Sequence, residues 1–181
     1  MLKTSKFSFT VVAIVSCLLS LAGCASVWPV ISGPHDIRVT SVTDVDFKDQ
    51  PQLDWAGLQP RPSIILTRIE FTTNADLLAL AKKRDYNVSY VFGPCIKHAV
   101  QDSGLGGGYV YSGKMILLPD TKETPEYAKA VAKGPPFSYQ VYTSKVHSNV
   151  ADIPMCLTLV GGNMMGGRIR SNFTAVPKAN N

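Results

Sequence analysis

Three side chains of the kinds used in acid, base and nucleophilic chemistry lie close together in the middle of the chain: His98, Asp102 and Ser103. In serine hydrolases these residue types act as general base, orienting acid and nucleophile, but such a triad is defined by its geometry in the fold and not by closeness in sequence. Polar surface loops often hold three such residues by chance. The segment therefore supports a hydrolase hypothesis, and a surface loop is the interpretation that we favour.

The other patterns that could bind a metal, a phosphate or a sugar are weak. Cys95 and His98 are three residues apart, but this is a single pair, whereas a structural zinc site needs four ligands. The run Gly104–Gly108 precedes a predicted strand and lacks the lysine of a phosphate-binding loop, so we expect a flexible turn. No two acidic residues are adjacent, which gives a two-carboxylate glycosidase no visible basis. We therefore expect no metal and no cofactor.

The first 24 residues have the three parts of a secretory signal. Lys3 and Lys6 precede an apolar run that ends in Leu21-Ala22-Gly23-Cys24. The run is shorter than the roughly 20 residues that a membrane-spanning helix needs. These residues resemble the lipobox of bacterial lipoprotein signal peptides, and the resemblance covers this leader alone.

The resemblance implies that residues 1–23 are a signal peptide and that the chain is cut before Cys24, which then carries lipid. Residues 24–36 are expected to form the lipidated cysteine and a Pro- and Gly-containing tether, and residues 37–181 a single domain. Ala25, in place of aspartate after the lipidated cysteine, implies sorting to the outer membrane. The implied location is the cell envelope, with the protein held at the membrane by the lipid anchor on Cys24.

Four cysteines become two in the mature chain, because Cys17 leaves with the signal and Cys24 is lipidated. Cys95 and Cys156 remain, and an even pair in an oxidising compartment predicts a disulfide; a nucleophilic cysteine or a metal ligand is the alternative. The net charge of +5 falls to +3 without the two leader lysines. This mildly basic chain has no dense basic stripe, so we expect no nucleic-acid partner.

Alternating apolar residues predict seven strands, and cap signals predict two short helices. The first strand places Ile37, Val39, Val45 and Phe47 on one face. The first helix is capped by Asn74, and the second begins at Thr124. The strands are expected over 37–47, 63–73, 86–92, 109–118, 137–146, 154–160 and 168–176, and the helices over 75–84 and 125–133. Without regular β-α alternation, this order predicts a mainly β fold: a two-sheet antiparallel β-sandwich, immunoglobulin-like or transthyretin-like.

Large apolar residues in two predicted loops are candidates for partner binding. Trp55 and Leu58 belong to the Pro-rich stretch 48–62, where a large aromatic either covers the open end of the core or anchors a partner. Met164 and Met165 lie in the glycine-rich turn between the last two strands and pose the same choice, since adjacent side chains of a strand point to opposite faces.

Two function classes follow from these features. The first is a non-catalytic binding or assembly module, held at the membrane by Cys24 and contacting an envelope protein or a polysaccharide. The second is an envelope-associated hydrolase that uses the region of His98, Asp102 and Ser103. We favour the first class because the anchor and the all-β pattern support it, and because the rest of the sequence suggests no convergent set of titratable groups.

Overall fold

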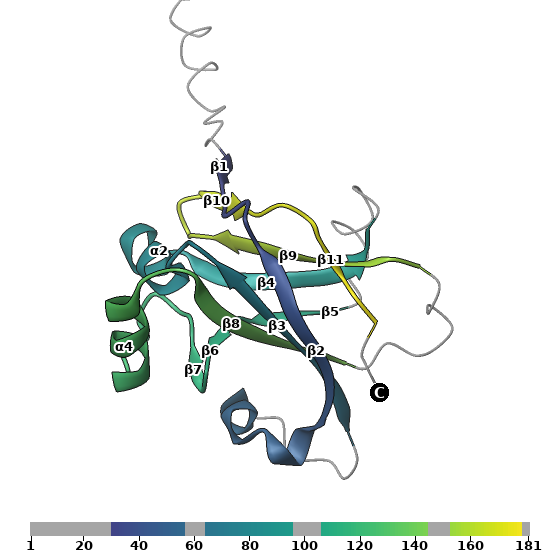
Figure 1. Cartoon of the computed structure of the whole chain (residues 1–181). Coiled ribbons are helices and arrows are strands. Elements are labelled where there is room, and N and C mark those ends of the chain that lie inside the picture. The colour runs from purple at the N-terminus through teal and green to yellow at the C-terminus, as the bar shows by residue number, and fades with distance from the viewer. Residues whose placement is uncertain (1–29, 57–63, 96–105, 145–152, 179–181) are drawn as a thin grey trace, which may run out of the picture.

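The fold is mainly β, with two sheets facing each other in a sandwich-like arrangement and two α-helices at one side (Figure 1). This computed structural model describes residues 30–56, 64–95, 106–144 and 153–178. The first sheet has the strand order β1-β10-β9-β4-β5, with β11 also pairing with β9, and the second has the order β2-β3-β8-β6-β7. Apart from the parallel pair β1–β10, neighbouring strands are antiparallel.

The strands of the first sheet are β1 (Val30–Ser32), β4 (Asn87–Pro94), β5 (Gly106–Tyr109), β9 (Met155–Gly162), β10 (Arg168–Arg170) and β11 (Thr174–Val176). Those of the second sheet are β2 (Arg38–Asp46), β3 (Ile65–Thr73), β6 (Tyr111–Ser112), β7 (Met115–Ile116) and β8 (Phe137–Ser144). Two 3-10 helices, η1 (Phe47–Asp49) and η2 (Pro51–Ala56), follow β2, and the α-helices are α2 (Leu77–Arg84) and α4 (Pro125–Lys133).

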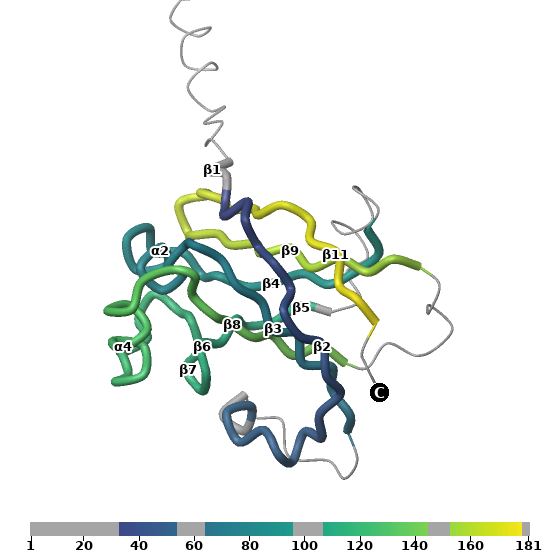
Figure 2. Tube along the Cα trace, in the orientation of Figure 1, coloured from purple at the N-terminus to yellow at the C-terminus, as the bar shows by residue number. Residues whose placement is uncertain are grey.

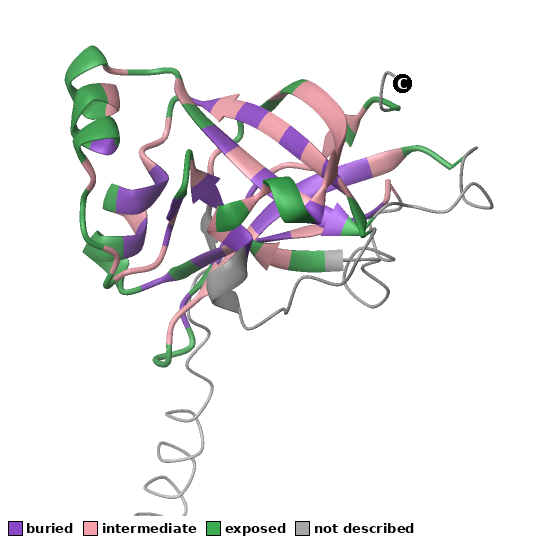
Figure 3. Ribbon diagram, turned by 90° about the horizontal axis from the view of Figure 1, so that it is seen from below, coloured by how far each residue is buried: buried purple, intermediate pink, exposed green. Residues whose placement is uncertain are grey.

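The main core lies between the two sheets and under the helices. Buried and less buried residues alternate along the longer strands, as the colours of Figure 3 show, because successive side chains point to opposite faces. The inner faces and α2 contribute side chains that are almost fully buried. The members of this main core include Ile69, Phe71, Leu77, Leu78, Val88, Tyr90, Phe92, Tyr139, Val141, Leu157 and Leu159.

The predicted mainly β fold with two helices is confirmed, and the second helix has the predicted ends. The Thr124 side chain accepts a hydrogen bond from the Tyr127 N–H (3.2 Å), and Pro125 opens α4. The predicted cap of the first helix is wrong. Asp76, not Asn74, caps α2, because its carboxylate accepts from the Ala79 N–H (3.0 Å) while the Asn74 N–H donates to Asp36 (2.7 Å).

The described strands outnumber the seven predicted because two of the predicted strands are interrupted and because β1 is not among the predicted ones. The predicted strand 109–118 is divided between the sheets, with β5 in one and the β6–β7 hairpin in the other. Part of the predicted glycine turn belongs to β5. A Cβ on Gly107 would lie 2.9 Å from the Tyr90 carbonyl oxygen, so glycine allows this strand to approach β4 closely. The immunoglobulin-like or transthyretin-like topology stays a prediction.

The predicted strand 168–176 is likewise two strands, β10 and β11, which pair with successive parts of β9. Between β10 and β11, Ser171 takes the place of a regular strand partner for Leu159 of β9. Its hydroxyl accepts from the Leu159 N–H (2.9 Å), and its own N–H donates to the Leu159 carbonyl (3.0 Å). The backbone groups of β9 therefore stay satisfied across the interruption.

The second half of the predicted tether is part of the sheet. β1 pairs in parallel with β10, with Val30 opposite Arg168, and the Gly33 N–H donates to the Arg170 carbonyl (2.7 Å). Asp36 then accepts from the Thr73 hydroxyl (2.6 Å) as well as from Asn74. These hydrogen bonds lower the pKa of the Asp36 carboxyl below its usual value. The stretch available as a free tether is therefore shorter than predicted, because backbone pairing fixes the chain from Val30 onward.

A β-bulge changes the faces of β2 partway along the strand. Val39 pairs with Phe71 and Ser41 with Glu70, so Thr40 is an extra residue without an opposite partner. Ile37 and Val39 therefore pack into the main core, as predicted, but Phe47 lies in a second cluster on the other face. The predicted single apolar face of this strand is wrong, because an extra residue shifts the alternation by one.

Candidate functional site

The catalytic hypothesis depends on residues outside the described part of the chain. His98, Asp102 and Ser103 all fall within 96–105, and Cys24 and Leu58 also lie outside the described ranges. Within residues 30–56, 64–95, 106–144 and 153–178, no three histidine, cysteine or acidic residues come together where they could hold a metal ion.

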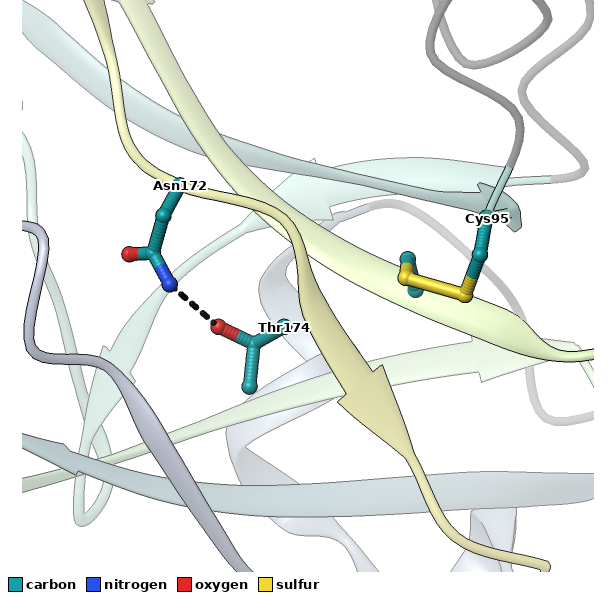
Figure 4. The surroundings of a disulfide bond; sticks show 4 residues. Cys95, Asn172 and Thr174 are labelled. Carbon is teal, nitrogen blue, oxygen red and sulfur yellow. Dashed lines mark hydrogen bonds between the residues drawn. A yellow bond between two sulfur atoms is a disulfide. The ribbon is translucent and has the colours of Figure 1, made fainter.

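The two cysteines in the described part of the chain form a disulfide, as predicted. Cys95 and Cys156 are joined with their Cα atoms 4.9 Å apart (Figure 4). Cys156 is buried within β9, and Cys95 follows the last residue of β4, where its N–H donates to the Pro154 carbonyl (2.8 Å). The bond therefore fastens one end of the central β4–β9 pair and leaves neither sulfur free as a nucleophile or a metal ligand.

The C-terminal strand covers β9 beside this disulfide. Ala175 of β11 is the register partner of Cys156, and Figure 4 shows Asn172 and Thr174 at the approach to that strand. The Asn172 amide and the Thr174 hydroxyl share a hydrogen bond of 3.1 Å. The Thr174 hydroxyl also lies 3.3 Å from the Ile37 carbonyl, so this strand also contacts the chain at the start of β2.

The two 3-10 helices are held on the outer face of the second sheet by a separate apolar cluster. Phe47, Leu53 and Tyr111 are buried there, and Leu66, Ile116 and Tyr142 pack against them. The Tyr111 and Tyr142 rings meet edge to face, with centroids 5.5 Å apart. The predicted long loop 48–62 therefore begins with two 3-10 helices, because Leu53 packs against the sheet and holds this Pro-rich stretch in place.

Polar contacts add to this docking. The Gln52 amide donates to the Tyr142 hydroxyl (2.6 Å) and to the Gln50 side chain (2.9 Å). Burial raises the pKa of Tyr142, which keeps its hydroxyl neutral and able to donate to Gln50 (3.0 Å). Trp55 lies in η2 by its backbone, while its side chain is outside the described part. The choice between a lid and an anchor for Trp55 stays open.

Exposed apolar side chains lie directly after the undescribed residues 57–63. Ile64 and Ile65 are 36% and 38% exposed, and the Ile64 carbonyl accepts from the Phe47 N–H (2.9 Å) at the start of η1. We name the end of the molecule formed by η1, η2, Ile64 and Ile65 the distal end. Sequence reasoning missed these two isoleucines, because at the start of a strand they are indistinguishable from core residues.

Tyrosine hydroxyls around the start of α2 are fully engaged in structural hydrogen bonds. The Tyr127 hydroxyl donates to the Asp76 carboxylate (2.6 and 2.7 Å), and the Tyr139 hydroxyl accepts from the Leu77 N–H (2.9 Å). Burial raises the pKa of both tyrosines, and the hydrogen bond to Asp76 raises that of Tyr127 further. Both hydroxyls therefore stay protonated at neutral pH, which suits a role in fixing the helices to the sheet and not one as a nucleophile.

The opposite end of the molecule carries the two candidate methionines. Met164 and Met165 are 101% and 69% exposed in the turn between β9 and β10. The Asn163 side chain donates to the Arg84 carbonyl at the end of α2 (3.2 Å), which brings the basic cluster Lys82–Arg84 next to this turn. We name the end of the molecule formed by β1, β10 and this turn the proximal end. The chain gives no local signal for this proximity, because 79 residues separate the hydrogen-bonded pair.

The structure thus separates the predicted partner-binding residues instead of bringing them together. β2 runs between the two ends, and its nine residues span about 30 Å at about 3.3 Å each. Figure 2 shows the purple segment before β2 at one end of the trace and the blue segment after β2 at the other. Trp55 therefore belongs to the distal end and the methionines to the proximal end.

No helix in the described ranges is long and apolar enough to cross a membrane. Comparison of the chain with protein-family models, with curated proteins and with solved structures finds no match.

Proposed function

We propose that this protein is a lipid-anchored lipoprotein of the bacterial cell envelope, at the outer membrane, which acts as a non-catalytic binding or assembly module. The observation that carries the proposal is Leu21-Ala22-Gly23-Cys24 at the end of a basic and then apolar leader. The disulfide adds support, because such bonds persist in the oxidising compartments that exported proteins reach.

The distal end is the surface that we assign to the partner. It lies at the end of β2 away from β1, so a lipid on Cys24 would leave it pointing away from the bilayer. Leu53 and the Gln52–Tyr142 hydrogen bond hold η2 in place before any partner binds, which reduces the entropy lost on association. The exposed isoleucines favour a protein partner over a polysaccharide, because aliphatic side chains gain most by being buried against apolar surface.

The first prediction concerns the anchor. Replacing Cys24 with serine removes the thiol that accepts the diacylglycerol, so metabolic labelling with a fatty acid should mark the wild-type protein and miss Cys24→Ser. The double variant Cys95→Ala/Cys156→Ala is the matched control, because it lacks two other cysteines and should keep its label. Equal labelling of the wild type and Cys24→Ser would falsify the lipoprotein assignment.

The second prediction concerns the partner surface. A photo-crosslinking amino acid at Ile65 should capture an envelope protein in intact cells, because this exposed side chain lies at the distal end. Val131 on α4 is the matched control, since it is also apolar and 43% exposed but belongs to neither end.

A variant that loosens the packing of η2 on the sheet tests the specificity of this crosslink. Leu53→Ala removes an apolar side chain that is only 6% exposed and should weaken the Ile65 crosslink. The same adduct at Ile65 and at Val131, or an Ile65 crosslink that Leu53→Ala leaves unchanged, would remove the distal end from the proposal.

A further inference from the structure

The turn between β9 and β10 holds two methionines in solvent on a well-defined scaffold. The Gly167 N–H donates to the Asn163 side chain (2.8 Å), and the Asn163 N–H donates to the Gly167 carbonyl (3.1 Å). Gly167 packs so closely on Tyr86 that an added Cβ would lie 2.3 Å from the tyrosine oxygen. These contacts fix the base of the turn, and Met164 and Met165 at its tip are exposed.

Positively charged residues belong to the segments that adjoin this turn, the last turn of α2 and β10. Lys83, Arg84 and Arg168 are all exposed, and none of them forms an ion pair with another described residue. Lys82 is paired with Glu123 (3.1 Å), and Asp85 ends α2. Counting Arg170 of β10 as well, five cations against two carboxylates leave this surface with a net charge of +3. Exposed apolar side chains beside cationic residues are the composition that favours the interface of an anionic membrane.

The path of the chain directs the same surface toward the bilayer. Val30 lies opposite Arg168 in a parallel pair, so the chain enters β1 at the end where β10 leaves the methionine turn. Figure 1 shows β1 and β10 together at this end of the molecule. Val30 is six positions after Cys24, and even a fully extended chain of that length spans only about 20 Å. A lipid on Cys24 would therefore hold the proximal end within about 20 Å of the membrane.

We propose that Met164 and Met165 insert into the interface of an anionic phospholipid bilayer, with Lys83, Arg84 and Arg168 facing its headgroups. This inference rests on the proposed lipid anchor at Cys24. With two points of attachment, the acyl chains and the turn, the protein stands in one orientation and presents its distal end away from the membrane.

The test uses lipidated protein reconstituted into vesicles that contain phosphatidylglycerol and headgroup-spin-labelled lipid. A fluorophore is attached to Met164→Cys, or to Val131→Cys as the matched exposed control. We expect the spin label to quench the probe at position 164 and to leave the probe at 131 unquenched. Adding Arg168→Gln should lower the inserted fraction about fivefold, the effect expected for one cation at an anionic surface.

The outcomes separate the insertion from the anchor. Protein that fails to float with the vesicles contradicts the lipid anchor itself, whatever the probes report. Protein that floats but shows equal quenching at 164 and 131, or quenching at 164 that is the same in purely zwitterionic vesicles, overturns the insertion and leaves the anchor standing. Protection of position 164 only after a second envelope protein is added would assign the turn to a protein partner and also overturn it.

Discussion

Removing the Cys95–Cys156 disulfide is expected to lower the free energy of unfolding by about 4 kcal/mol. The bond closes a loop between residues 61 positions apart, and the chain-entropy model assigns a cross-link of this length about that stabilisation. A domain of ordinary size has only about 5–15 kcal/mol of stability, so the loss is a large part of the total. The double variant Cys95→Ala/Cys156→Ala should therefore unfold at a much lower urea concentration than the wild type.

Reduction provides the matched control for this experiment. Dithiothreitol should shift the urea midpoint of the wild type to that of the double variant and leave the variant unchanged. Thiol counting on denatured, unreduced protein should find neither Cys95 nor Cys156 free. If the variant instead unfolds with the wild type, the β4–β9 backbone ladder holds this end of the sheet without the bond, and the stabilising role assigned to the disulfide is wrong.

The parts of the fold that the sequence predicts are those with strong local chemistry. The alternation of β3 and β8 follows the burial of their side chains, and Thr124, Pro125 and Gly134 mark both ends of α4. The disulfide is predicted from the cysteine count and the expected export, without knowledge of the fold. In each case the deciding information lies within a few residues or in the composition.

The parts that escape prediction depend on partners far away in the chain. β1 is a three-residue strand whose only described ladder partner, β10, lies 138 residues further on, so no local periodicity marks it. The glycines of β5 carry no side-chain pattern, and the requirement for glycine at Gly107 comes from the closeness of the Tyr90 carbonyl. The same holds for the proximal end, where Arg84 meets Asn163, and for the distal end, where Leu53 meets Tyr111 and Tyr142.

The bulge in β2 explains why the alternation of apolar residues predicts the faces of this strand wrongly. One extra residue shifts the alternation partway along the strand. The odd-numbered apolar positions Ile37, Val39, Val45 and Phe47 look like one face, but with the extra residue Thr40 between them Ile37 and Val39 join the main core and Phe47 joins the outer cluster. Val42 consequently pairs with buried Ile69 and packs on the main core, although its even number places it on the predicted polar face. The distal end exists because Phe47 reaches the outer face of the sheet.

Deleting Thr40 is therefore expected to be tolerated, whereas deleting Thr43 is expected to cost about 3–5 kcal/mol, the range for losing a buried large side chain. Without Thr40, Ser41 follows Val39 and every later pair of β2 with β3 keeps its partner and its face. Without Thr43, the residues that follow change face, so Phe47, now only 4% exposed, turns away from the outer cluster.

The two variants each lack one threonine from the same strand, which makes them matched controls in urea unfolding. Deletion of Thr40 should stay within about 1 kcal/mol of the wild type, as expected where no native contact is lost. Equal losses in the two deletions would contradict the bulge at Thr40, since a regular strand would lose its register in both.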